Sequence, residues 1–400
     1  MTATGPEREM LSGDLLADEA RLDDPDALAQ GDPGRMLRAT AAAGPQIREA
    51  MQLASETDLA RLGEEGRPRA LVIAGVGTAA RTGEVLAAVA GPRSPVPVLA
   101  HRSPGVPGWV GAADVVVAVS ASGHSPEALA AAEAAARRGA RLVAVGAPGT
   151  PLQSVAETAR APFIPVPRRA PARASLWGLV VPVVLAGRAL GLIKVAEADL
   201  VETAARLDDD AERCRESAES FVNPAKSLAL DLAGSIPVVW GSSPLAAVAA
   251  GRFADLLSTN ARYPAVEGSL GEVGRGRIGL LDGVFGGLTE KGRDIFADPT
   301  TGERTRMHLV LLRDGGLTVE NEDNGEPVAV EERRAEAVAA LARRRGIRCT
   351  VLTAAGGSPL ERLASLVAVP DFASIYLALA HGLDPMAVPA VSELKTALTP

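Results

Sequence analysis

The chain has 400 residues, of which 47% are hydrophobic, 3% aromatic and 22% charged, and its net charge is −8 at pH 7. This length and apolar content are enough for two domains of ordinary size, each with its own core. A negative charge with few aromatic residues argues against nucleic acid as a partner, because phosphate backbones are bound by basic surfaces.

The composition also argues against membrane, disulfide and metal functions. No apolar run reaches the ~18 residues that a bilayer span needs, and Met1–Asp14 lacks a basic start followed by an apolar stretch. The two cysteines, Cys214 and Cys349, are far apart and outside any C-x-x-C pair. We therefore expect a cytoplasmic protein without membrane contact, without a metal site and without a cofactor.

The first half of the chain reads as an arm followed by alternating strands and helices. Residues 1–35 are polar, acidic and broken by Gly and Pro, which predicts a loose N-terminal arm. From Met36 to Leu59 the apolar residues fit one helical face. Helical stretches at 82–90 and 126–138 then alternate with four valine-rich runs, at 70–74, 96–100, 114–119 and 141–145. Near-continuous apolar strands that alternate with helices indicate a parallel sheet covered on both faces.

The second half repeats this pattern. We place the first domain at 36–204, a polar connector at 205–220 and the second domain at 221–400. After Ile236 the alternation resumes with strands at 236–240, 307–312 and 347–352 and helices at 244–260 and 330–345. The second domain thus looks like a diverged copy of the first. The predicted fold class is α/β, with two doubly wound, flavodoxin-like parallel-sheet domains in tandem.

A serine-rich loop, Ser120–Ser125, follows one predicted strand and opens the helix at 126–138. Ligands of such sheets bind at the carboxyl ends of the strands. The positive end of the helix, the close backbone approach at Gly123 and the hydroxyls of Ser120, Ser122 and Ser125 favour an anion there. The alternative is that these serines only finish the strand and cap the helix.

A second strand-to-helix turn precedes this loop in the chain, and it contains Gly75, Gly77 and Thr78. A lone G-x-G is weak evidence for phosphate binding. We predict that this turn takes part in the same anion site.

The motif S-A-S-G-H-S-P-E at 120–127 resembles the S-x-S-G-x-T/S-x-E loop of the sugar isomerase (SIS) domain family, whose hydroxyls bind the substrate phosphate. Other stretches are similar to its bifunctional phosphoglucose/phosphomannose isomerase branch, in order after Asp24: G-V-G-T-A at 75–79, P-A-R-A-S-L-W at 171–177, N-P-A-K at 223–226, S-T-N-A-R-Y-P-A at 258–265 and V-S-E-L-K at 391–395. The resemblance implies two SIS-type domains and a homodimer.

The activity that the resemblance implies is aldose–ketose isomerisation of glucose or mannose 6-phosphate to fructose 6-phosphate through an enediolate. Glu267 would be the base that moves the proton, and Arg173 and Lys395 would be the cations that stabilise the oxyanion. The alternative for each of the three is a solvated surface charge.

The sequence departs from the family at the group that opens the sugar ring. Leu270 stands where a histidine is expected, and the segment after Arg313 contains none. We favour His381 as the replacement, although it also fits a plain helix C-terminus before Gly382. Two hypotheses therefore remain: an isomerase, and a non-catalytic protein that binds a sugar phosphate as a sensor or accessory partner.

Overall fold

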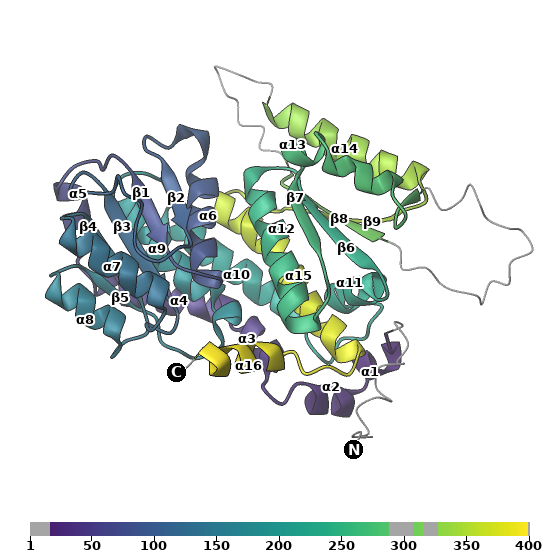
Figure 1. The fold of residues 1–400 in the computed structure, drawn as a ribbon. Helices are drawn as coiled ribbons and strands as arrows, with labels where there is room; N and C mark the ends of the chain where they lie inside the picture. The colour runs from purple at the N-terminus through teal and green to yellow at the C-terminus, as the bar shows by residue number, and fades with distance from the viewer. Residues whose placement is uncertain (1–16, 288–306, 316–326, 399–400) are drawn as a thin grey trace, which may run out of the picture.

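The computed structural model describes residues 17–287, 307–315 and 327–398 and contains two parallel sheets (Figure 1). The first sheet has the order β2-β1-β3-β4-β5, which is the flavodoxin-like order 2-1-3-4-5. Its strands are β1 (Leu71–Ala74), β2 (Val98–His101), β3 (Val115–Ser120), β4 (Arg141–Gly146) and β5 (Phe163–Pro165). Each neighbouring pair runs parallel.

The second sheet has the order β7-β6-β8-β9, and its pairs are also parallel. Its strands are β6 (Ile236–Gly241), β7 (Val266–Ser269), β8 (Met307–Arg313) and β9 (Arg348–Thr353). This order repeats the first four positions of the first sheet. The predicted fold class, two doubly wound parallel sheets in tandem, is confirmed.

Two strands, β5 and β7, were not predicted. Both are short, and each ends a sheet's order. β5 reads F-I-P and lies between further prolines, whereas β7 reads V-E-G-S and contains a charge and a glycine. Neither strand shows a valine-rich run or a clear alternation of apolar and polar residues. Their proline and glycine fit the edge of a sheet, where these residues are accepted.

Helices cover both faces of each sheet (Figure 1). On the outer faces lie α7 (Pro126–Arg137), α8 (Pro151–Thr158), α13 (Leu270–Val273) and α14 (Pro327–Arg344). Between the sheets lie α4 (Ala43–Ser55), α6 (Thr78–Ala90), α9 (Leu176–Ala189), α10 (Glu197–Arg213), α11 (Pro224–Leu232), α12 (Pro244–Leu256) and α15 (Pro359–Ala380). This middle layer forms one continuous core with residues of both sheets, such as Ile73 and Val310.

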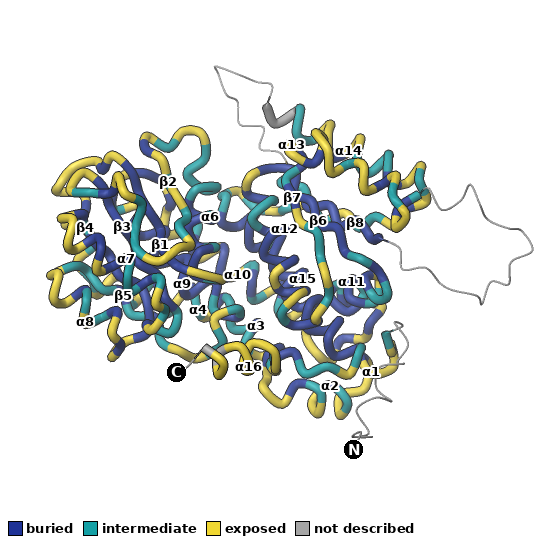
Figure 2. The backbone as a smooth tube through the Cα atoms, viewed as in Figure 1, coloured by how far each residue is buried: buried dark blue, intermediate teal, exposed yellow. Residues whose placement is uncertain are grey.

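Helix α15 is the centre of this layer, and it is drawn almost entirely in the colour of buried residues in Figure 2. Among the described helices it alone is long and apolar enough to cross a membrane by length and composition, yet 94% of its most apolar window is buried inside the protein. It also carries buried polar residues that pair with its neighbours. α15 is therefore the core helix of this fold.

Residues 17–35 were predicted to belong to a loose arm, but they form helices that pack on the core. α1 (Glu19–Asp23), α2 (Pro25–Gly31) and α3 (Met36–Ala41) follow one another, and the Asp18 N–H donates to the carbonyl of Ala380 at 3.1 Å. Aspartates cap α1 and α2, and Leu22 and Leu28 are buried. These helices are only five and seven residues long, so their charged residues, Gly and Pro looked like loop composition in the sequence. Residues 1–16 lie outside the described part.

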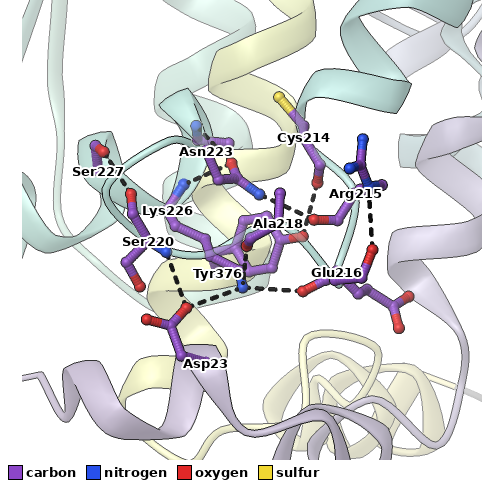
Figure 3. A network of polar contacts seen from close by, with 12 residues as sticks. Asp23, Cys214, Arg215, Glu216, Ala218, Ser220, Asn223, Lys226, Ser227 and Tyr376 are labelled. Carbon is purple, nitrogen blue, oxygen red and sulfur yellow. Dashed lines mark hydrogen bonds and ion pairs between the residues drawn. The ribbon is translucent and has the colours of Figure 1, made fainter.

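The predicted connector, 205–220, begins inside α10, which continues to Arg213. The loop that follows is held by Lys226, whose ammonium donates to Asp23 Oδ1 at 3.2 Å and to the carbonyls of Glu216 and Ala218 at 2.9 and 2.7 Å (Figure 3). Burial lowers the pKa of Lys226, while Asp23 opposes that change. All three ammonium protons have partners, so this lysine has a structural role.

The remaining short elements are α5 (Arg61–Glu64), the 3-10 turns Gly91–Arg93, Ala172–Ala174 and Arg277–Asp282, the π-helical turn Leu257–Ala261, and α16 (Pro389–Leu398).

The core contains a buried ion pair between Arg252 of α12 and Asp371 of α15, with N–O distances of 2.6 to 3.1 Å. We expect Arg252→Leu to lower the free energy of unfolding by about 3–5 kcal/mol, because it leaves Asp371 charged and unpaired in the core. The double change Arg252→Leu with Asp371→Leu should recover most of this loss. Urea unfolding of the three proteins measures it, and a single-mutant cost near the ~1 kcal/mol of a surface pair would contradict the prediction.

Candidate phosphate site and the interface between the sheets

The two predicted phosphate segments lie side by side at the carboxyl edge of the first sheet. The turn at 75–77 follows β1 and leads to β2 through α6, whereas the loop at 121–125 follows β3 and leads to β4 through α7. The chain thus leaves neighbouring strands in opposite directions, and in open α/β sheets this switch point is where the ligand crevice is expected. A Cβ on Gly75 would lie 2.8 Å from the carbonyl oxygen of Val119, so only glycine lets the two segments approach this closely.

Serine hydroxyls organise the loop after β3. Ser120 Oγ accepts from the N–H groups of Gly123 and Ser125 at 3.0 and 3.3 Å. Ser122 Oγ accepts from the His124 N–H at 3.2 Å and lies 3.5 Å from Ser120 Oγ. These backbone N–H groups are thus bonded within the loop. The hydroxyls of Ser120 and Ser122 and the uncapped start of α7 are the donors that this loop can offer an anion.

Ser125 differs from the prediction for it. It stands at the N-cap position of α7, but its hydroxyl makes no capping bond and donates instead to Glu127 Oε2 at 2.7 Å. The carboxylate of Glu127 therefore competes with any anion for this hydroxyl. A phosphate at the helix start would have to displace it.

The conformation of the loop depends on glycine at position 123. Gly123 has φ +70°, and a Cβ on it would lie 2.1 Å from Thr150 Oγ1. Thr150 is buried, and its hydroxyl donates to the Ala147 carbonyl at 2.7 Å. Thr150 was not predicted as part of the site; the turn G-A-P-G-T-P after β4 is the signal that could have indicated it.

Arg173 follows β5, so it also lies toward the carboxyl edge of the first sheet, but the partners of its side chain belong to the second half. Nε donates to Asn260 Oδ1 at 2.9 Å, and Nη2 donates to the carbonyls of Pro385 and Met386 at 2.8 and 3.0 Å. Burial lowers its pKa from the usual arginine value. Arg173 is therefore an interface residue rather than a surface charge.

A second arginine holds the same C-terminal turn. Arg262, at φ +59°, donates from Nη2 to the carbonyls of Asp384 and Ala387 at 3.1 and 2.5 Å. Four consecutive carbonyls, 384 to 387, thus accept from two guanidinium groups. Helix α16 starts after this turn, and Lys395 lies on it, but the side chain of Lys395 is outside the described part.

Glu267 is exposed in β7, where it pairs in register with Val239 of β6, and its carbonyl accepts from Arg277 Nη1 at 2.7 Å. Among the described residues its carboxylate has no hydrogen bond or ion pair, and none links it to Arg173 or to the serine loop. The structure therefore does not bring the predicted base into contact with the predicted phosphate site.

The departure at Leu270 has a physical reason. Leu270 starts α13, is 2% exposed and packs with Trp240, Val273 and Leu281 in the outer core of the second sheet. A histidine here would be buried among apolar side chains. The position is therefore part of the core of the second domain.

Three of the four histidines have a hydrogen-bonded ring nitrogen. His381 Nε2 lies 2.6 Å from the Tyr263 hydroxyl, and burial lowers the pKa of His381. Both ring nitrogens of His308 are bonded, to the Asp231 carbonyl and to Thr350 Oγ1. His101 Nε2 is buried without a partner, whereas His124 is exposed and its Nδ1 lies 2.7 Å from the Ser122 carbonyl.

The corresponding crevice of the second sheet, between β6 and β8, holds a carboxylate of the chain itself. Asp314 Oδ2 accepts from the Ser243 hydroxyl at 2.6 Å, and Oδ1 accepts from Arg362 Nε at 2.7 Å. The Asp314 N–H donates to Ser242 Oγ at 3.0 Å. The two halves therefore share a topology but differ at their ligand positions. In the described ranges no three His, Cys, Asp or Glu side chains are grouped as metal ligands.

Residues 221–398 match the family described as the bacterial phospho-glucose isomerase C-terminal SIS domain. The chain is also 27% identical over 330 residues to a bifunctional phosphoglucose/phosphomannose isomerase of Caldicellulosiruptor bescii. That match covers 82% of this chain and 89% of the relative.

Two solved structures share the fold. A hypothetical protein from Thermus thermophilus matches with a TM-score of 0.62 and 19% identity, over 96% of this chain and 98% of its own. The C-terminal domain of glucosamine-fructose-6-phosphate aminotransferase from Francisella tularensis matches with a TM-score of 0.60 and 12% identity, over 87% of this chain and 97% of its own. Residues 221–398 thus match a SIS domain, and the two flavodoxin-like sheets are the fold that the chain shares with these solved structures.

Proposed function

We propose that the protein is a phosphosugar isomerase that interconverts glucose or mannose 6-phosphate and fructose 6-phosphate. The observation that carries this proposal is the topological switch point between β1 and β3, where two strand-to-helix turns meet and the hydroxyls of Ser120 and Ser122 lie 3.5 Å apart. Helix N-termini and hydroxyls suit a phosphate dianion. The similarity to a bifunctional phosphoglucose/phosphomannose isomerase supports the choice of substrate.

In this proposal, Glu267 moves the proton between C1 and C2 of the open sugar, and Arg173 and Lys395 stabilise the enediolate oxygen. Arg173 is held between the domains by Asn260 and by the carbonyl of Pro385, so its charge is fixed next to the turn that precedes α16. The exposed Glu267 would have to approach the sugar through domain closure or from the second subunit of a homodimer. His381 opens the ring only if it leaves Tyr263.

A non-catalytic role remains the second candidate, and one observation favours it. The ring of His381 is tied to Tyr263, both ring nitrogens of His308 are bonded, and Nδ1 of His124 lies at the Ser122 carbonyl. A protein that binds a sugar phosphate without opening its ring would not need His381 to leave Tyr263.

The loop is tested by the double change Ser120→Ala with Ser122→Ala. It removes two hydroxyl donors to a charged ligand, each worth about 1.5–3 kcal/mol, so the dissociation constant for fructose 6-phosphate should rise by at least ~100-fold. Calorimetric titration measures the change. Thr158→Ala, on the exposed side of α8, is the hydroxyl control. Unchanged affinity in the double variant would remove the phosphate site from this loop.

Turnover is tested by fructose 6-phosphate formation from glucose or mannose 6-phosphate, with Glu267→Gln as the variant. A general base contributes ~10²–10⁴-fold, so kcat should fall by at least ~100-fold while ligand affinity is kept. Glu272→Gln, five residues further along and also exposed, is the matched control. Activity that survives Glu267→Gln rejects this base, and a wild-type protein that binds both ligands without turnover supports the non-catalytic role.

A further inference from the structure

Arg81 joins the phosphate-binding edge of the first domain to the second domain. It lies in α6, one turn after the Gly75–Gly77 turn, and its side chain is 12% exposed. Nη1 pairs with Glu84 Oε2 on the same helix at 2.6 Å, and Nη2 pairs with Asp255 Oδ2 on α12. Glu84 also pairs with Arg102, which directly follows β2. Four charges thus run in sequence from the edge of the first sheet to α12.

The opposite helix has a glycine where the guanidinium lies. A Cβ on Gly251 of α12 would be 2.6 Å from Arg81 Nη1 and 3.2 Å from its Cζ. Glycine within a helix is unfavourable by itself, because its unfolded chain has more freedom. The missing side chain therefore makes the space in which Arg81 sits against α12, as expected of a shaped contact between α6 and α12 (Figure 1).

This contact differs from an ordinary ion pair on a helix. Surface pairs at i and i+3 contribute little, since both partners stay hydrated. Arg81 is largely desolvated and bridges two carboxylates: the partly buried Glu84 and the 61% exposed Asp255 of the other domain. Asp255 lies five residues before Asn260, the partner of Arg173, so α12 and the turn after it contact the first domain through both arginines.

We propose that Arg81 is a positioning residue, which fixes the phosphate crevice of the first domain at a set distance from α12 and the second domain. This proposal rests on the proposed function, because it assumes a ligand whose phosphate binds the first domain while its sugar reaches the second. Inorganic phosphate touches only the crevice. Arg81 should therefore matter for a sugar phosphate and not for free phosphate.

The test compares Arg81→Ala with the wild-type protein in two titrations, one with fructose 6-phosphate and one with inorganic phosphate. We expect the sugar phosphate to bind ~10-fold or more weakly, with kcat falling by up to ~100-fold, the effect of an ångström-scale misplacement. Phosphate affinity should stay at the wild-type value. Arg81→Lys should recover only part, because an ammonium lacks the planar fork that reaches two carboxylates.

Gly251→Ala tests the same contact without any change of charge. It should reproduce the loss seen with Arg81→Ala and lower Tm, although alanine is the better helix former. Arg215→Ala removes an exposed i and i+3 pair with Glu212 and serves as the control. Wild-type ratios of sugar phosphate to phosphate affinity in both Arg81→Ala and Gly251→Ala would overturn the proposal, as would an equal change in Arg215→Ala.

A distance measurement separates this proposal from the proposed function. Spin labels on Glu133→Cys in α7 and Glu336→Cys in α14, in a Cys349→Ser background, report the separation of the domains. Arg81→Ala and Gly251→Ala should broaden the distance distribution, and Arg215→Ala should not. If wild-type protein binds neither ligand, the proposed function fails while the broadening still tests the contact. An unbroadened distribution rejects the positioning role even where turnover is found.

Discussion

Helix α15 must be enclosed by protein on every side, and the arrangement of both sheets follows from that constraint. A single sheet with helices on its faces cannot surround a 22-residue apolar helix, but two sheets that share a middle layer can. Because this layer is buried, the polar side chains inside it lose their contact with water and need partners within the protein. Arg252 with Asp371, and Asn260 with Ser374, are paired inside it because an unpaired charge or amide there would cost several kcal/mol.

The same layer determines how the two carboxyl edges relate to each other. Helix α6, which follows β1, packs against α12, which follows β6, so a change in this packing would shift the carboxyl edge of the first sheet relative to that of the second. Arginines carry most of the polar contacts described across this boundary. Their planar, multiply donating head groups can satisfy carbonyls and carboxylates of several segments at once.

Much of the fold could be predicted from local patterns. The strands β1, β3, β4, β6 and β8 are continuous apolar runs, and their alternation with helices identifies a parallel sheet. β5 and β7 could not be predicted in this way, because they are short edge strands that contain proline or glycine. The serine loop was also recognisable, because its glycine and hydroxyls stand between a strand end and a helix start, where such sheets bind ligands. Its internal bonds were not, because sequence does not show which N–H groups Ser120 and Ser122 already accept from.

The rest of the site depends on contacts between distant segments. Nothing near Arg173 in the chain indicates Asn260 or the turn at 384–387, and nothing near Leu270 indicates that it packs against Trp240. For Glu267 the resemblance implied the role of a catalytic base. In the described ranges, however, this residue is exposed rather than enclosed in a pocket.

The carboxylate of Asp314 has a consequence for the history of this duplicated fold. Two copies of one architecture start with two equivalent ligand positions. In the second copy, Ser243 and Arg362 are already saturated by a side chain of their own polypeptide, which works as a permanent internal ligand. The molecule is therefore symmetric in topology and asymmetric in chemistry: within the described residues, the first sheet presents serine hydroxyls after its central strand, and the second presents a carboxylate bound to Ser243 and Arg362.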